Sequence, residues 1–204
     1  MIAQDIARIL LKEKAVFLRP QDPFTWTSGI RSPVYCDNRL LISTVEPRNQ
    51  IVRAFCEEIE KLDVDLIAGT ATAGIPWASF VAQELRLPMV YVRSSSKEHG
   101  RQNAIEGRAE KGMKSVLMED LISTGKSSIA AARKLEEEGV KVARVMSLFT
   151  YGFEEADAIF RDAGFSYQSL TNFDILAQVA FDDHQLDKET LDQVLTWRRG
   201  VKFP

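Results

Sequence analysis

Apolar positions follow a helical period at both ends of the chain and form short continuous runs between them. Near the N-terminus, Ile2, Ile6, Ile9 and Leu10 share one helical face, which predicts a helix ending around Lys14. Further helices are expected at about residues 47–62, after residue 76, at 127–138 and 154–163 and after residue 187, and strands at 34–36, 66–68, 89–92, 116–118, 142–148 and 165–170.

Short strands alternate with helices from about residue 64 to residue 171. This order predicts an α/β fold with a mainly parallel central sheet and helices on both faces. We expect one domain over residues 1–204, in which residues 1–45 form a small N-terminal hood. The polar stretch from 93 to 114 is too long for an idle connection, so a mobile catalytic loop is expected at about residues 94–110.

Composition excludes several classes of protein. Of the 204 residues, 45% are hydrophobic and 27% are charged, as in ordinary soluble folds. No apolar run approaches the roughly 18 residues of a membrane span, and the N-terminus lacks a signal-peptide pattern. Cys36 and Cys56 are too few for a disulfide scaffold or a zinc cluster, so a cytoplasmic protein is expected. A formal net charge of −3 disfavours binding to nucleic acid.

The most informative segment is residues 116–128, Val-Leu-Met-Glu-Asp-Leu-Ile-Ser-Thr-Gly-Lys-Ser-Ser. A buried strand delivers Glu119 and Asp120 to its carboxyl end, and a hydroxyl- and glycine-rich turn then opens a helix. Such a turn suits a phosphate monoester, and paired carboxylates suit vicinal hydroxyls, which together describe a site for ribose 5-phosphate. The alternative is a helix capped by Ser or Thr beside exposed acids. A nucleotide-hydrolase P-loop is disfavoured because its first glycine would fall on Asp120.

Three other segments contain candidate binding groups. The small-residue loop 69–76 follows a strand and suits a pyrophosphate, or else it lets a helix pack closely. Arg93, Lys97 and His99 suit a cationic lid, or else a solvated hairpin. The aromatic segment 24–35 suits a slot for a planar ring, or packing of the N-terminal piece onto the sheet. His184 is expected at the surface.

The chain resembles a known family through four motifs in order. The stretch 119–128 is similar to the signature of type I phosphoribosyltransferases, and three further motifs narrow the resemblance to the orotate phosphoribosyltransferase family. These are Ser28-Gly29-x-x-Ser32-Pro33-x-Tyr35-x-Asp37-x-Arg39, Gly69-Thr70-Ala71-Thr72-Ala73-Gly74-Ile75-Pro76, and Arg93-x-x-x-Lys97-x-His99-Gly100 with Ile105-Glu106-Gly107.

The resemblance implies Mg²⁺-dependent transfer of ribose 5-phosphate from 5-phosphoribosyl 1-diphosphate (PRPP) to N1 of orotate, in pyrimidine biosynthesis. The Mg²⁺ would be held mainly by donor oxygens and water. The resemblance also implies a non-proline cis peptide in the pyrophosphate loop. It assigns PRPP to Arg93, Lys97, His99, Glu119, Asp120, Leu121, Ile122, Ser123, Thr124, Gly125, Lys126, Ser127, Ala71 and Thr72, with Lys97, Arg93, His99 and Asp120 as the catalytic set. Orotate would meet Ser123 and the backbone near Ile30 and Arg31.

The same resemblance implies a homodimer in which the lid residues act in the neighbouring subunit. This chain departs from some members, which carry lysines where it has Thr27, Ala73 and Ser94, and an orotate-binding arginine near Thr150. Lys126 replaces a frequent glycine, so its backbone is expected to turn without the freedom of glycine. Two other functions stay open: transfer to another base, and a ligand-sensing regulator built on the same fold.

Overall fold

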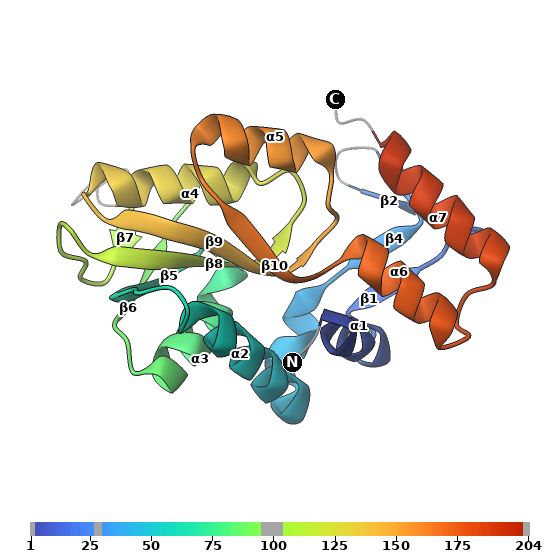
Figure 1. The fold of residues 1–204 in the computed structure, drawn as a ribbon, viewed down its shortest axis with the longest axis horizontal. Coiled ribbons are helices and arrows are strands. Elements are labelled where there is room, and N and C mark those ends of the chain that lie inside the picture. Colours follow the sequence, from blue (N-terminus) through green and yellow to red (C-terminus); the bar gives the residue numbers. More distant parts are fainter. Residues whose placement is uncertain (1–2, 27–29, 95–103, 202–204) are drawn as a thin grey trace.

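The computed structural model describes residues 3–26, 30–94 and 104–201. Its centre is a six-stranded sheet in the order β10-β9-β8-β5-β6-β7, parallel except for β7 at one edge (Figure 1). The strands are β5 (Leu66–Thr70), β6 (Met89–Val92), β7 (Ile105–Glu106), β8 (Lys114–Ile122), β9 (Lys141–Thr150) and β10 (Tyr167–Asn172). The expected α/β class is therefore confirmed.

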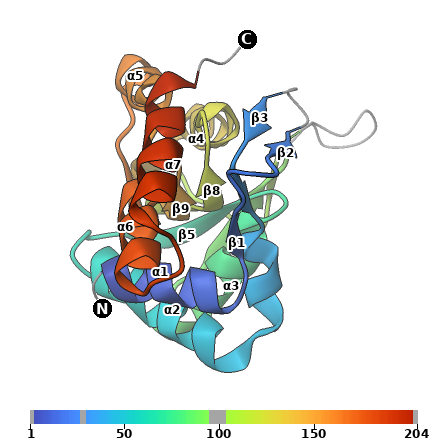
Figure 2. The same ribbon diagram turned by 90° about the vertical axis from the view of Figure 1, so that its right-hand side faces the viewer.

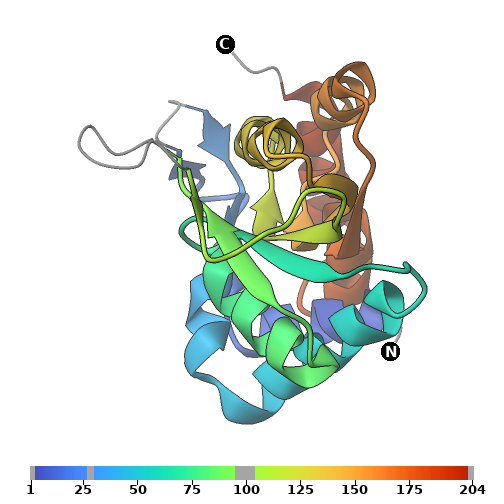
Figure 3. The same cartoon turned by 90° about the vertical axis from the view of Figure 1, so that its left-hand side faces the viewer.

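Helices cover both faces of the sheet. The helices are α1 (Ala3–Lys12), α2 (Val45–Ile59), α3 (Gly74–Leu85), α4 (Lys126–Glu137), α5 (Glu154–Ala163), α6 (Phe173–Asp182) and α7 (Lys188–Gly200). Figure 3 shows the yellow α4 above the sheet and the cyan and green α2 and α3 below it. Adjacent strand residues point to opposite sides, since Leu117 joins the cluster under α4 and α5 whereas Val116 and Met118 join the other cluster. Burial on both faces explains the continuous apolar runs.

The structure extends or adds to the expected elements. β8 continues through Glu119 and Asp120 to Ile122, because its pairing with β9 continues as far as Ile122 opposite Thr150. α6 is not expected from the sequence, although Asn172 caps it by accepting a hydrogen bond from the Ile175 amide at 2.9 Å. Its exposed polar residues, Asp174, Gln178 and Asp182, lie four positions apart, so the sequence does carry an amphipathic helical period here. No helix in the described ranges is long and apolar enough to cross a membrane.

The segments before α2 pack beside the sheet. β1 (Val16–Leu18) pairs with β4 (Val34–Cys36), and β2 (Phe24–Thr25) pairs with β3 (Arg31–Ser32) to form a short hairpin that stands clear of the sheet in Figure 2. Trp197 of α7 donates from its indole N–H to the Arg31 carbonyl at 2.9 Å, which ties the hairpin to the C-terminal helix. A 3₁₀ helix, η1 (Asn38–Ser43), then leads to α2.

Candidate active site

The predicted binding segments converge at the carboxyl ends of β5, β6 and β8. These strands are neighbours, with Gly69 opposite both Tyr91 and Met118. Just beyond the paired region, the Ala71 amide donates to the Val92 carbonyl at 2.9 Å, so the loop after β5 begins beside Arg93. Loops that follow adjacent parallel strands open onto one crevice, where ligands bind in folds of this class.

Glu119, which is buried, and Asp120, which is half-buried, form an acidic pair in this crevice. Glu119 is 6% exposed and its Oε2 accepts a hydrogen bond from Ser128 Oγ at 3.3 Å. Burial, followed by the nearby charge of Asp120, raises the pKa of Glu119 to about 8. Burial also raises the pKa of Asp120, while its hydrogen bond with Glu119 and the charge of Arg39 oppose that shift. Once ionised, the two carboxylates can accept hydrogen bonds from the hydroxyls of a bound diol.

The turn after β8 presents open amide groups. Gly125 lies just before α4 with φ +79°, and no side chain of the described residues caps this helix. The expected alternative, a helix capped by Ser or Thr, is therefore wrong. Lys126 is the first residue of α4 and has no positive φ, so it takes its place in the turn without the freedom of glycine, and Gly125 adopts the left-handed conformation. Thr124 is half-buried, and Ser127 is exposed at the helix start, as a phosphate site requires.

Ile122 contributes to this turn differently from its neighbours. Its side chain is 1% exposed and packs in the cluster under α4 and α5. Its carbonyl accepts hydrogen bonds from Thr150 Oγ1 at 3.0 Å and from the Tyr151 amide at 3.2 Å. The side chain that the resemblance assigns to PRPP thus faces the core, because the strand continues to this residue and alternation points it inward.

The loop after β5 is narrow and built on backbone. The Ala71–Thr72 peptide is cis, as the resemblance implies. Ala71 is half-buried and Thr72 is exposed. α3 begins at Gly74, where an added Cβ would lie 2.3 Å from the Met118 carbonyl oxygen. Glycine is therefore required here by close packing of α3 on β8, and among the described residues α3 too lacks a side-chain cap.

Arg93 is held at the end of β6. Its Nη1 lies 3.4 Å from Glu106 Oε1 of β7, and Lys134 of α4 donates to the Arg93 and Ser94 carbonyl oxygens at 2.7 and 3.0 Å. These contacts place the first predicted lid residue beside the crevice. Lys97 and His99 lie outside the described residues.

A cavity of about 280 Å³ opens next to the turn after β8. Its walls are Thr25, Trp26, Tyr35, Cys36, Leu121, Ser123 and Tyr151. The rings of Trp26 and Tyr151 lie 5.0 Å apart, and a hydrogen bond from Trp26 Nε1 to the Val34 carbonyl at 3.2 Å orients the indole. This wall of aromatic rings suits a planar ligand.

Of the three residues predicted to bind orotate, one lines this cavity and two do not. Ser123 lines it, whereas its described walls do not include Ile30 or Arg31. Thr150 lies near the position at which the resemblance implies an orotate-binding arginine in some relatives. Its hydroxyl accepts a hydrogen bond from the Gly152 amide at 3.1 Å and donates to the Ile122 carbonyl, so it is used by the backbone at the end of β9. Leu121, assigned to PRPP by the resemblance, lies in the wall of this cavity.

Similarity to known proteins agrees with this geometry. A model of the phosphoribosyl transferase domain matches residues 44–180. An orotate phosphoribosyltransferase of Coxiella burnetii is 47% identical over 199 residues, which is 97% of this chain and 95% of that protein. The chain belongs to the orotate phosphoribosyltransferase family.

Solved structures extend the similarity to the fold of this family. UMP synthase of Leishmania donovani matches with a TM-score of 0.82 and 25% identity, over 96% of this chain but only 42% of that longer one. Orotate phosphoribosyltransferase of Aeropyrum pernix matches with a TM-score of 0.75 and 29% identity, over 89% of this chain and 99% of that one.

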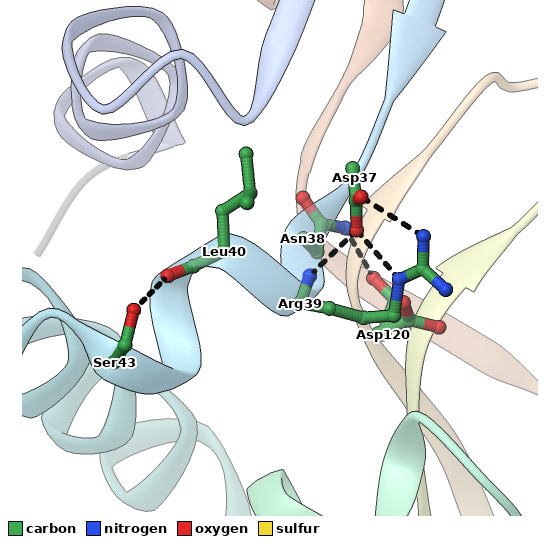
Figure 4. Close-up of polar contacts among 6 residues, drawn as sticks. All are labelled: Asp37, Asn38, Arg39, Leu40, Ser43 and Asp120. Carbon is green, nitrogen blue, oxygen red and sulfur yellow. Dashed lines mark hydrogen bonds and ion pairs between the residues drawn. The ribbon is translucent and has the colours of Figure 1, made fainter.

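Two groups at the site of this family member are not singled out by the sequence. Tyr151 enters the cavity wall from the end of β9, and no local motif marks it. Asn38 donates from Nδ2 to the Asp120 carbonyl at 2.7 Å, while Asp37 and Arg39 pair beside it at 2.6 Å (Figure 4). The first of the family motifs includes Asp37 and Arg39 and so marks this segment, but it leaves position 38 unspecified and assigns no role to Asn38.

Proposed function

We propose that this chain catalyses the transfer of ribose 5-phosphate from PRPP to N1 of orotate, forming orotidine 5′-monophosphate and pyrophosphate for pyrimidine biosynthesis. The observation that carries the proposal is Ser123, which belongs both to the turn of open amides and to the wall of the aromatic cavity. A base in the cavity would therefore lie next to a ribose phosphate bound at the turn.

The residues can be assigned to successive parts of the donor. The amides of the turn at residues 123–127 bind the 5-phosphate, and Glu119 and Asp120 accept hydrogen bonds from the ribose hydroxyls. The loop at Ala71 and Thr72 offers backbone to the pyrophosphate. With the donor bound in this way, the C1 atom of the ribose would face the cavity, in which N1 of orotate would lie.

Electrostatics supplies the catalysis in this proposal. The bond between C1 and the pyrophosphate oxygen breaks with its electron pair going to pyrophosphate. N1 of orotate forms the new bond to C1 and loses its proton, which the departing pyrophosphate takes up directly or through water. Negative charge grows on the leaving group, and Arg93, Lys97 and His99 stabilise it. Lys97 is assigned the largest share. No covalent nucleophile is required.

Magnesium fits this site as an ion that would be bound together with the donor. The described residues contain no cluster of three or more His, Cys, Asp or Glu side chains that could hold a metal by themselves. Mg²⁺ commonly keeps several waters and binds substrate phosphates, so donor oxygens and water would complete its coordination. When bound, it supplies charge neutralisation for the pyrophosphate.

The assembly is part of the proposal. We assign a homodimer in which Arg93, Lys97 and His99 serve the partner's site, on the strength of family membership. Mixing Lys97→Ala subunits with Asp120→Asn subunits tests this, because shared sites would restore activity in one of the two sites of each mixed dimer. A cytoplasmic location is supported by Cys36 and Cys56, which are both free thiols.

The reaction is tested by following the ultraviolet absorbance of orotate with PRPP and Mg²⁺. We expect a loss of absorbance that requires all three components and falls strongly in Asp120→Asn, whose affinity for PRPP should also fall in calorimetry. PRPP binding without orotate consumption would favour another base, which a screen of purines would identify. Binding of PRPP with no transfer to any base would favour a ligand-sensing regulator.

A further inference from the structure

The acidic pair lies on a part of β8 that is no longer paired with β5. The register between β5 and β8 ends at Gly69 opposite Met118, while β8 runs on through Glu119 and Asp120 to Ile122. On the other side, β9 continues to pair as far as Ile122. The backbone at the acidic pair therefore borders the crevice on the side where β5 has ended, and needs other partners there.

Side chains supply those partners at Asp120. The Asp120 amide donates to Glu119 Oε1 at 3.2 Å, and its carbonyl accepts from Asn38 Nδ2 at 2.7 Å. A carbonyl oxygen can only accept, so the amide nitrogen of Asn38 must face it. The bond joins residues 82 positions apart, and Figure 4 shows Asn38 reaching from η1 to the strand.

Packing alone does not explain why an asparagine occupies position 38. It is 1% exposed, and its Oδ1 has no hydrogen-bond partner among the described residues. A buried acceptor without a partner is destabilising, whereas an apolar side chain would avoid that cost. The amide is therefore explained by what its Nδ2 does at Asp120.

The residues on either side of Asn38 fix its direction. Asp37 accepts from the Arg39 amide at 3.3 Å and from two guanidinium nitrogens of Arg39 at 2.6 and 2.9 Å. This local pair closes the start of η1 around Asn38. Among titratable groups, Glu119 and Arg39 act on Asp120, and the charge of Asp120 in turn helps to raise the pKa of Cys36 and of Tyr151.

We propose that Asn38 is a positioning residue, which holds the backbone of Asp120 so that the Glu119–Asp120 pair faces the ribose hydroxyls of the donor. The inference rests on the proposed function and adds a residue outside the loops that touch the donor. It predicts that losing the Nδ2 donor weakens the binding of PRPP and leaves the aromatic cavity unaffected.

The test uses two variants and calorimetric titration with PRPP and Mg²⁺. Asn38→Leu removes the donor, and we expect about tenfold weaker PRPP binding at every pH, near the upper end of one lost hydrogen bond. Asn38→Asp keeps the shape of the side chain. Its introduced carboxyl can donate to the Asp120 carbonyl only when protonated, so the ratio of its PRPP affinity to that of the parent should fall as pH rises.

Kinetics separate positioning from general damage. We expect the KM for PRPP to rise in both variants while the KM for orotate stays within about twofold. Thr171→Val is the matched control, because Thr171 is 2% exposed with an Oγ1 that lacks a partner among the described residues. It should keep the PRPP affinity of the parent.

Three results would overturn the inference: unchanged PRPP affinity in Asn38→Leu, a pH-independent affinity ratio in Asn38→Asp, or a parallel rise of both KM values with a lower Tm. Failure of the proposed function has a different signature, since the parent itself would then not bind PRPP or consume orotate. If Asn38→Leu does not fold, the pH series of Asn38→Asp decides the question.

Discussion

Gly74→Ala tests the close contact between α3 and β8. The added Cβ would lie 2.3 Å from the Met118 carbonyl oxygen and 3.4 Å from Glu119 Cα, where ordinary contacts begin at 3.4 Å. Met118 cannot yield, since it is paired with Gly69 on one side and with Met146 on the other. α3 must therefore retreat by about 1 Å, and the loop that carries the cis peptide moves with it.

The size of the effect follows from that displacement. Overpacking of this kind costs about 1–3 kcal/mol of unfolding free energy, and each kcal/mol corresponds to a Tm decrease of about 2–4 °C for a chain of this length. A misplacement of about 1 Å in a binding loop can reduce kcat/KM about 10²-fold. We therefore expect a Tm lower by several degrees and a much larger proportional loss in kcat/KM for PRPP.

Thermal unfolding and steady-state kinetics measure the two effects in the same preparation. Gly200→Ala is the control, because its added Cβ would have no heavy atom within 4 Å and the residue lies in α7. That variant should keep the kcat/KM of the parent and unfold at the same or a slightly higher temperature. A Gly74→Ala protein with the Tm and kcat/KM of the parent would refute the packing argument.

Four further predictions concern the crevice and the residues around it. The pKa of Glu119 is raised to about 8 and the bound diol requires its ionised form, so PRPP affinity should increase about tenfold from pH 7 to pH 9. The Glu119→Gln variant should lose this pH dependence, and a PRPP affinity of the parent that does not change with pH would contradict the prediction. In the absence of PRPP, the same shift means that the Glu119 contribution to stability is fully present below pH 4.5 and decreases as pH rises through 8, which urea unfolding at several pH values would detect by comparison with Glu119→Gln. Trp26→Ala should raise the KM for orotate about tenfold while PRPP affinity in calorimetry stays within about twofold, because ring contacts of this kind add about 0.5–1.5 kcal/mol beyond the buried area; an equal loss for both substrates would indicate a folding defect. Lys97→Ala should lower kcat strongly without changing the Tm, and an unchanged kcat would remove Lys97 from the mechanism.

The amino-acid sequence by itself determined the alternation of strands and helices in the central sheet, apart from α6, and the chemistry of the loops. Alternating apolar runs and helical patterns predict the parallel sheet, because burial on both faces leaves a signal in each strand. The segment 119–128 predicts a ribose phosphate site from the types and order of its residues. These features are local, so a single stretch of chain contains them. His184 is exposed as expected, with no neighbouring motif to give it a role.

Only the tertiary structure decided which residues meet. The cavity wall joins residues near 25, 35, 121 and 151, and the contact between Asn38 and Asp120 crosses 82 positions. β8 extends past the acidic pair because β9 continues beside it, whereas β5 stops and leaves a backbone edge for Asn38. Strand length and side-chain partners depend on neighbours that are distant in the sequence, and no local pattern encodes them.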